Sequence, residues 1–543
     1  MAECVPNRKL IAELMEKEEK RLEQETPKSY ELYQRAVKHM PMGVASTYQA
    51  RDPYPIYFTH GKGPHIWTIE GREIVDFHNG FGCMVQGHAH PVIVEAIQKR
   101  APLGTQFALP TEDSIIMAEN LASAFKLPKW RFVNSGSEAT MDAIRVARAF
   151  TGREPIVKMF GSYHGHHDYV MVSIGALDYG KIGPRDNYAS LSYGAGIPQS
   201  SIDMTVPVPF NDLENMTKRI ERMVEEGNPP ACVIMEPAMM NLGVVLPEPG
   251  FLEGVRELTR KHGIVLIFDE VKVGICTARG GAVERWGILP DMVTLGKALA
   301  GGTPCGAIGG SDEIMEKVND GTVFQVGTYS GNPLSMAAAR ASFEQVMTDE
   351  AYAHLNHLND RLIEKCDAIC KKYDFPGYTV GISSKGCVNF ALGKITDYES
   401  FIREQDAELV ALAWLYNINR GLIIAPGREE EWTLSITHTD ADVDLFVDAF
   451  ARLCGEWCER HVTLFTGHVL LEGSLASQTD VVGSCMRFYE HMQAPGIDLL
   501  TEHNREFITA KQVASAARQF GRKWRLTETY GCTGWDFPFA AHK

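Results

Sequence analysis

The chain has 543 residues, of which 45% are hydrophobic and 22% are charged, a composition typical of a folded protein with a large core. Its formal net charge of -16 argues against nucleic acid as the main partner, because phosphate backbones bind basic surfaces. No apolar run reaches the roughly 18 residues that a membrane span needs, and the charged N-terminus has no apolar signal segment. With 12 cysteines in no regular spacing, the chain is expected in the reducing cytoplasm, with no membrane partner.

The predicted elements begin with helical structure over residues 1 to about 40, which ends at Pro41. The segment "HIWTIEGREIVDFHNG" predicts a hairpin around Glu70-Gly71. From about residue 91 to 330, short apolar runs alternate with helical patterns such as 138–150, 213–226 and 251–262. This alternation predicts an α/β fold whose mainly parallel sheet has helices on both faces.

Four parts are predicted along the chain. Residues 1–90 hold the N-terminal helix and part of a small domain, and residues 91–334 form a large domain that carries the ligand site. Residues 335–458 mix helices with a few strands and predict the rest of a smaller α+β domain. The character of the sequence changes near residue 460, so residues 459–543 are treated as an extension.

Ligands of parallel α/β sheets collect at the carboxyl ends of the strands, and three such ends are distinctive. Ser135-Gly136-Ser137 follow "WRFVN" at the start of a helix, whose free N–H groups suit a phosphate; a plain helix cap by Ser137 is the alternative. Asp269 ends the run "GIVLIFD", where a buried carboxylate needs a partner; a helix cap or an ion pair with an arginine is the alternative.

The third strand end carries Lys297, the one cationic side chain in "PDMVTLGKALAGGTPCGAIGG". Apolar surroundings lower the pKa of a lysine toward its neutral, nucleophilic amine. Tyr163, in "GSYHGHHD", could supply an aromatic platform. The histidines beside it have no cysteine and only one aspartate with them, and Cys454 and Cys458 lack a second pair, so we expect no metal.

These features are the parts that a pyridoxal 5'-phosphate site needs. A lysine bonds to the aldehyde of the cofactor, and a carboxylate keeps the ring nitrogen protonated so that the ring withdraws electrons. A helix N-terminus holds the phosphate, and an aromatic ring stacks on the pyridine ring. The sequence therefore predicts this cofactor.

Residues from about 40 to 458 resemble the class III (fold type I) aminotransferases, most closely the glutamate-1-semialdehyde 2,1-aminomutase branch. The resemblance is carried, in order and spacing, by "NSGSEATMDAIRVARAFTGR", "GSYHGHHD", "EPAMMNLGVVLPEPGFLEGVRELTRKHGIVLIFDEV", "PDMVTLGKALAGGTPCGAIGG" and "GTYSGNPLSMAAA". It implies a fold type I α/β large domain with a smaller α+β domain and pyridoxal 5'-phosphate as cofactor. It also implies a homodimer that takes a small-molecule amino donor and oxo acceptor.

The resemblance implies a role for each site residue. Lys297 would bind the cofactor covalently and carry protons, Asp269 would pair with the ring nitrogen, and Tyr163 would pack on one ring face. The other cofactor contacts would come from Val271 on the second face, Asn241 near the ring hydroxyl, Ser135, Gly136 and Ser137 at the phosphate, and Thr328 at the phosphate of the partner subunit. Glu236 and His164 would support the site from behind.

The chain also departs from the branch. "DEVKVGIC" stands where the branch often reads "DEVMTGFR", so Lys272 is new and an arginine is absent. Gln49 stands where the branch has a carboxylate-binding arginine, which leaves Arg51, Arg428 and Glu430 as the expected substrate-binding residues. We therefore expect a transaminase for amino acids, β-amino acids included, or amines, with the 2,1-aminomutase as the alternative.

Residues from about 460 to 543 lie outside the aminotransferase pattern. They resemble part of a bacterial α-L-rhamnosidase-like glycoside hydrolase barrel, with Glu472 and Glu528 at the ends of strand-like runs. A closed barrel needs roughly 200 residues or more, so this extension is too short to build a catalytic cleft. A carbohydrate-binding or scaffolding chimera is the alternative function of another class.

Overall fold

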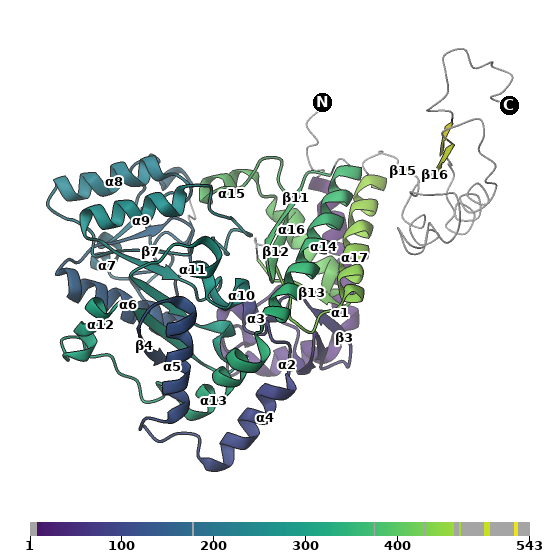
Figure 1. Cartoon of the computed structure of the whole chain (residues 1–543). Coiled ribbons are helices and arrows are strands. Elements are labelled where there is room, and N and C mark those ends of the chain that lie inside the picture. Colours follow the sequence, from purple (N-terminus) through teal and green to yellow (C-terminus); the bar gives the residue numbers. More distant parts are fainter. Residues whose placement is uncertain are drawn as a thin grey trace. The chain divides into compact units, whose positions relative to one another are not determined.

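A computed structural model of the chain describes residues 8–175, 179–373, 375–427 and 431–460, and three short strands of the extension (Figure 1). One compact unit consists of residues 14–365 and 376–444 and carries all the described site residues. The other consists of residues 1–13, 366–375 and 445–543.

The large unit is built on a seven-stranded sheet with the strand order β4-β10-β9-β8-β7-β5-β6. The strands are β4 (Lys129–Val133), β10 (Gly306–Gly310), β9 (Met292–Leu295), β8 (Val265–Asp269), β7 (Cys232–Met235), β5 (Ile156–Met159) and β6 (Thr205–Val208). The five strands from β9 to β6 are parallel, and β10 runs antiparallel between β9 and β4. The five parallel strands, β5 to β9, and the antiparallel β10 are buried along their whole length, as expected for a sheet covered on both faces.

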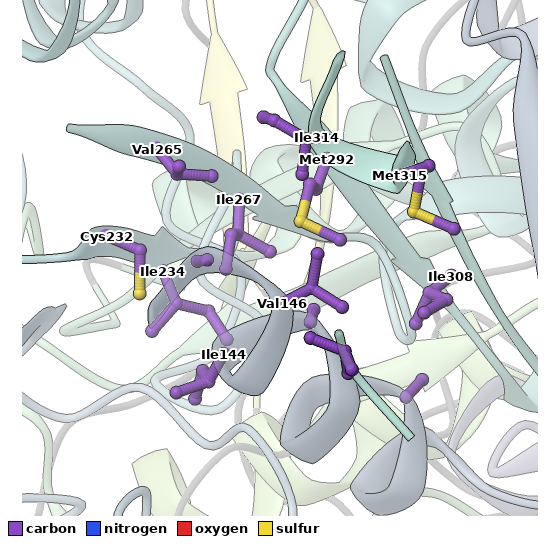
Figure 2. Close-up of a cluster of buried hydrophobic side chains, with 14 of the residues drawn as sticks. Ile144, Val146, Cys232, Ile234, Val265, Ile267, Met292, Ile308, Ile314 and Met315 are labelled. Carbon is purple, nitrogen blue, oxygen red and sulfur yellow. The ribbon is translucent and has the colours of Figure 1, made fainter. Parts of the chain in front are cut away.

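Helices cover both faces of this sheet, which confirms the predicted α/β class (Figure 1). The α-helices between residues 91 and 341 are α4 (Pro91–Arg100), α5 (Glu112–Phe125), α6 (Gly136–Thr151), α8 (Leu213–Glu225), α9 (Phe251–His262), α11 (Gly281–Trp286), α12 (Asp312–Asn319) and α13 (Pro333–Ala341), with the short helices α7 (Gln199–Asp203) and α10 (Gly274–Thr277). The short α3 (Asn79–Gly82) precedes them. Ile144 and Val146 of α6 pack against Ile234 and Ile267 of the sheet (Figure 2). This core fixes the start of α6 beside the strand ends.

Two smaller sheets complete the unit. The first has the order β1-β2-β3-β13, and the second has the order β11-β12-β14. Their strands are β1 (Phe58–Lys62), β2 (His65–Thr68), β3 (Glu73–Asp76), β13 (Leu422–Ile423), β11 (Tyr378–Ile382), β12 (Lys385–Asn389) and β14 (Glu431–Thr433). The hairpin expected around Glu70-Gly71 is the antiparallel pair β2–β3.

The remaining helices are α1 (Arg8–Glu25), α2 (Pro27–Ala36), α14 (Asp349–Tyr373), α15 (Tyr398–Glu404), α16 (Ala407–Ile418) and α17 (Asp440–Arg460). The single N-terminal helix expected from the sequence is divided, because Thr26 is not helical and Pro27 opens a second helix, a position that proline favours. In the part of the chain that the structure describes, no helix is long and apolar enough to cross a membrane. Nor do the described residues bring together three His, Cys, Asp or Glu side chains able to hold a metal ion.

Three short strands are described in the extension: β15 (Thr466–Gly467), β16 (Ala494–Leu499) and β17 (Leu526–Thr529), paired in parallel. Glu472 lies outside the described residues, as do Arg428 and Glu430. The likeness of the extension to a glycoside hydrolase stays a prediction, and so do the four domain boundaries.

Candidate active site

Three strand ends meet where the sequence predicts a site. β4, β8 and β9 run in the same direction, so Ser135, Asp269 and Lys297 follow at one edge of the sheet. A Cβ atom built on Gly296, next to Lys297, would lie 3.2 Å from Cγ1 of Val271 and 3.3 Å from the backbone N of Gly136. The segments carrying the predicted lysine, ring-face valine and phosphate loop are therefore in contact.

Lys297 has an unusual backbone conformation. It follows β9 directly after Gly296 and has a φ of 42°, in the left-handed region, which costs a side-chain-bearing residue about 1 kcal/mol or more. Burial lowers the pKa of Lys297, and the charge of Lys272 lowers it further, although Cys83, Asp269 and Glu236 oppose the shift. A neutral amine at this position is a nucleophile.

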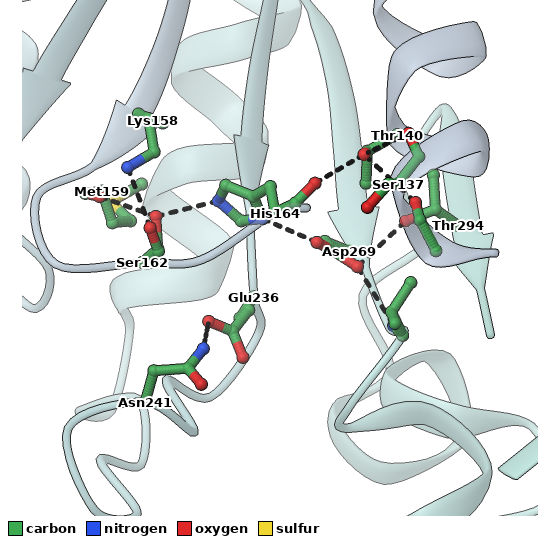
Figure 3. A network of polar contacts seen from close by, with 12 residues as sticks. Ser137, Thr140, Lys158, Met159, Ser162, His164, Glu236, Asn241, Asp269 and Thr294 are labelled. Carbon is green, nitrogen blue, oxygen red and sulfur yellow. Dashed lines mark hydrogen bonds and ion pairs between the residues drawn. The ribbon is translucent and has the colours of Figure 1, made fainter. Parts of the chain in front are cut away.

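Asp269 is 3% exposed at the end of β8. Its Oδ2 lies 2.6 Å from Nδ1 of His164, and its Oδ1 accepts hydrogen bonds from Thr294 Oγ1 at 3.0 Å and Val271 N at 3.1 Å (Figure 3). The partner of this buried carboxylate is thus a histidine, and the alternative of an arginine ion pair is wrong. Oδ1 already accepts two hydrogen bonds, whereas Oδ2 contacts His164 and can accept one more, so the group can still meet a protonated ring nitrogen.

His164 extends the contacts of Asp269 into the protein interior. Its Nε2 lies 2.8 Å from Oγ of Ser162, which donates to the carbonyl of Met159 at 2.6 Å (Figure 3). The ammonium of the fully buried Lys158 donates to the carbonyl of Ser162 at 2.9 Å, and burial lowers the pKa of Lys158 to about 7. Burial also lowers the pKa of His164 against the pull of Asp269. These contacts fix Asp269 on the side that faces the protein interior.

The start of α6 makes a tightly packed loop. Oγ of Ser135 accepts a hydrogen bond from the backbone N of Glu138 at 3.2 Å, so Ser135 and not Ser137 is the helix cap. A Cβ atom on Gly136 would lie 2.6 Å from Cγ1 of Val271. Any residue other than glycine would therefore clash with Val271 at this position. The backbone of Gly136 therefore lies close to the strand ends, where the N–H groups at the start of α6 can bind an anion.

Three aromatic side chains lie together near Asp269. The ring of Tyr163 meets that of Tyr48 edge-on at 5.7 Å between centroids, and Tyr48 lies 5.5 Å from Phe81. Burial raises the pKa of Tyr163. Tyr48 is 52% exposed, whereas Tyr163 lies close enough to Asp269 for its charge to act on the phenol.

Asn241 lies beside a buried carboxyl group. Its Nδ2 donates to Oε1 of Glu236 at 3.3 Å (Figure 3). Burial raises the pKa of Glu236 to about 8, and the nearby Asp269 adds to the shift. The raised pKa favours the protonated, neutral form of Glu236 at neutral pH.

The structure describes Arg51 and Thr328 among the predicted substrate and partner residues. Arg51 is half-buried, and its charge, with those of Lys272 and Lys385, acts on His78. Thr328 is exposed and lines a hollow of about 800 Å³ together with Gln106 and Trp130; no described contact joins it to Lys297 or Asp269 of the same chain.

Comparison with known proteins places the chain in a family. Residues 47–387 match the aminotransferase class-III family. The chain belongs to the class-III aminotransferases. A glutamate-1-semialdehyde 2,1-aminomutase from Syntrophobacter fumaroxidans is 38% identical over 425 residues, which cover 77% of this aminotransferase and 95% of the relative.

Solved structures of related enzymes also resemble this aminotransferase. A glutamate-1-semialdehyde aminomutase from Pseudomonas aeruginosa PAO1 has a TM-score of 0.76 at 28% identity, covering 83% of this chain and 99% of that one. An omega-transaminase from Sphaerobacter thermophilus has a TM-score of 0.74 at 34% identity, covering 79% of this chain and 97% of that one. The family confirms that this aminotransferase is an enzyme of fold type I with pyridoxal phosphate as cofactor, as predicted.

Sequence reasoning missed two groups of residues in this aminotransferase. Ser162 and Lys158 support His164, but both occur in a strand and turn that show no unusual pattern except a lysine among apolar residues. Glu431 pairs with Lys272 at 2.6 Å. The unexpected lysine in "DEVKVGIC" was the only signal that a buried anion lies nearby.

Proposed function

We propose that this aminotransferase moves an amino group between an amino acid or amine and an oxo acid or aldehyde, with Lys297 as the residue that binds the cofactor. The observation that carries the proposal is the position of Lys297 and Asp269 at the ends of the adjacent strands β9 and β8. The lowered pKa of Lys297, caused mainly by burial, supports it. The residues present also fit the cofactor, since the close approach of Gly136 to Val271 leaves the N-terminus of α6 for a phosphate.

When bound, pyridoxal phosphate withdraws electrons from the substrate carbon that carries the amino group. The neutral amine of Lys297 would bind the aldehyde carbon of the cofactor with loss of water. Once the amine of the substrate has replaced it there, Nζ of Lys297 would be free to move a proton between the substrate carbon and the cofactor. Asp269, held by His164, Thr294 and Val271, keeps a negative charge at the ring nitrogen. Water is excluded from these groups by the strand ends that bury them.

The other cofactor contacts are proposed on the same basis. Tyr163 and Val271 would enclose the ring, Asn241 would face its hydroxyl group, and Ser135 and Ser137 would bind the phosphate together with Gly136. Arg51 would bind the carboxylate of an acidic substrate, because its charge acts on His78 together with those of Lys272 and Lys385.

Transaminase and aminomutase differ in their need for a second substrate. The identity to curated aminomutases favours the mutase as second candidate, whereas Gln49 in place of an arginine and Lys272 favour another substrate. The test is turnover of a panel of amino donors with and without pyruvate or 2-oxoglutarate. Product that forms only with an acceptor supports the transaminase, and rearrangement of a donor without any acceptor supports the mutase.

A homodimer is also proposed. Leu109, Phe324, Val326 and Tyr329 expose between 60% and 78% of their surface near Thr328, an apolar face that a second copy of the chain would cover. Thr328 would then reach the phosphate in the partner subunit. Sedimentation of the wild type and of Val326→Asp tests this: a dimer that the aspartate dissociates supports it, and a wild-type monomer contradicts it.

The extension remains a separate question. If residues 459–543 bind carbohydrate, the full chain will bind polysaccharide and a chain ending at residue 458 will not. Equal binding by both chains, or none, would leave the aminotransferase as the only function.

A further inference from the structure

A buried group of three charged residues lies beside the site: Lys272, Glu431 and Lys385, termed here the lysine–glutamate cluster. Their side chains are 7%, 1% and 0% exposed. Oε2 of Glu431 lies 2.6 Å from Nζ of Lys272, and Oε1 lies 2.7 Å from Nζ of Lys385. Two lysines thus share one carboxylate, which leaves the cluster with a net charge of +1.

The strands fix this arrangement. Lys385 and Glu431 lie on the antiparallel strands β12 and β14, where Lys385 pairs with Thr433. Nζ of Lys385 also donates to Oγ1 of Thr433 at 2.7 Å. Lys272 comes from the loop after β8, three residues beyond Asp269. Glu431 therefore anchors a lysine of the active-site loop to the small sheet.

Lys272 also contacts the loop that carries Asn241. Its Nζ donates to the carbonyl of Met240 at 2.6 Å and to Oδ1 of Asn241 at 3.3 Å. With Glu431, these contacts match the three N–H groups of an ammonium. Because Oδ1 of Asn241 faces Lys272, its Nδ2 points the other way, to Glu236 at 3.3 Å.

Lys272 directly follows Val271, which packs against Gly296 next to Lys297, so the charge of Lys272 reaches Lys297. The titratable groups that act on Lys297 are Lys272, Asp269, Glu236 and Cys83. Burial raises the pKa of both Glu236 and Cys83 and so favours their neutral forms, whereas Asp269 and Lys272 act on Lys297 with opposite signs. Around Lys272 itself lie Glu431, Lys385 beyond it, His78, and the ring of Phe81 at 6.0 Å.

We propose that Lys272, held by Glu431, is a positioning residue for amino transfer: it fixes the orientation of the Asn241 carboxamide and places a positive charge beside Lys297. This rests on the proposed role of Lys297 as the cofactor-binding lysine. The positive charge disfavours a proton on Nζ of Lys297, so more of the lysine is neutral and reactive at a given pH. The bound carboxamide presents its N–H groups in one fixed direction.

The test is a spectroscopic pH titration of the holoenzyme, made with pyridoxal phosphate. The midpoint of the change in the visible band of the lysine-bound cofactor is compared between the wild type, Lys272→Met and Lys272→Arg. Lys272→Met makes the cluster neutral without stranding an ion, because Glu431 keeps Lys385. Its midpoint is expected to rise by about one pH unit, whereas Lys272→Arg keeps the charge and stays near the wild type. Lys394→Met, at an exposed pair with Glu248, is the matched control and should not shift.

Glu431→Gln supplies the opposite change. Removing the carboxylate leaves both lysines charged, so the midpoint is expected to fall. Opposite shifts are not produced by a general loosening of the fold. If Glu431→Gln does not fold, Lys272→Met against Lys272→Arg still decides. A second reading is the rate at which pyridoxal phosphate attaches to the apoenzyme at neutral pH, which should fall in Lys272→Met because less Lys297 is neutral.

The outcomes separate the inference from the proposed function. A wild-type protein that forms no visible band with the cofactor overturns the role of Lys297. If the wild type forms a normal band but the midpoint of Lys272→Met is unchanged, the role of Lys272 alone is overturned. Shifts of Lys272→Met and Glu431→Gln in the same direction would overturn it as well.

Discussion

Replacing Asp269 with asparagine isolates the charge of this side chain from its shape. The amide keeps Oδ1 as acceptor for Val271 N and Thr294 Oγ1. Its NH2 group takes the place of Oδ2, 2.6 Å from Nδ1 of His164. His164 can then accept at Nδ1 and donate from Nε2 to Ser162, whose hydroxyl both accepts and donates. The fold therefore tolerates the change.

We expect a small loss of stability and a large loss of reaction rate. Exchanging a charged for a neutral hydrogen bond in this network costs about 1–2 kcal/mol in the free energy of unfolding. Removing the negative charge from the ring nitrogen slows the reaction with the amino donor by about 100- to 1,000-fold. The variant should still bind pyridoxal phosphate in full, because Lys297 and the loop at Gly136 are unchanged.

The assay is stopped-flow decay of the visible band at a saturating amino donor, alongside cofactor content and urea unfolding of the apoenzyme. Asp291→Asn is the matched control: Asp291 pairs with Arg256 at 2.7 Å and precedes β9, at the other end of the strand from Lys297. It should lose stability but keep the rate. A rate for Asp269→Asn within about tenfold of the wild type would refute the role of the carboxylate, since that role requires a larger loss.

Further predictions concern the phosphate loop and a surface ion pair. Gly136→Ala places a Cβ 2.6 Å from Val271 and should weaken cofactor binding about tenfold or more; unchanged affinity by titration of the apoenzyme would contradict the fit. Arg185 contacts three carboxylates at 2.5–2.6 Å, those of Asp212, Asp397 and Glu399. Although burial raises the pKa of Asp212, hydrogen bonds from Asn215 and Arg185 hold it below its usual value. Arg185 is partly exposed, so Arg185→Ala should cost about 1 kcal/mol of unfolding free energy at pH 7. A lowered carboxylate pKa stabilises above the unfolded-state value, so this cost should shrink below about pH 4; a constant loss across pH would contradict it.

Much of the site could be predicted because it follows directly from strand ends. Asp269 and Lys297 each end an apolar run, and parallel strands bring such ends to one edge. The start of α6 was predicted for the same reason, with the cap displaced by two residues to Ser135. Local patterns were sufficient wherever the function depends on where a strand stops.

Contacts between distant segments could not be predicted in this way. The partner of Asp269 is His164, 105 residues earlier, and no periodicity indicates that these two side chains meet. Glu431 meets Lys272 only because β14 pairs with β12 in a separate sheet. Such pairs depend on how sheets and loops pack together, and a single sequence carries that information only as an unexplained charge in an apolar setting.

The central claim is that Lys297 binds pyridoxal phosphate covalently, and the most direct test is the absorption spectrum of purified wild type and Lys297→Ala, each supplied with the cofactor. The account predicts a visible band in the wild type that bleaches with an amino donor, and neither band nor turnover in the variant. A variant that keeps both the band and turnover would contradict it.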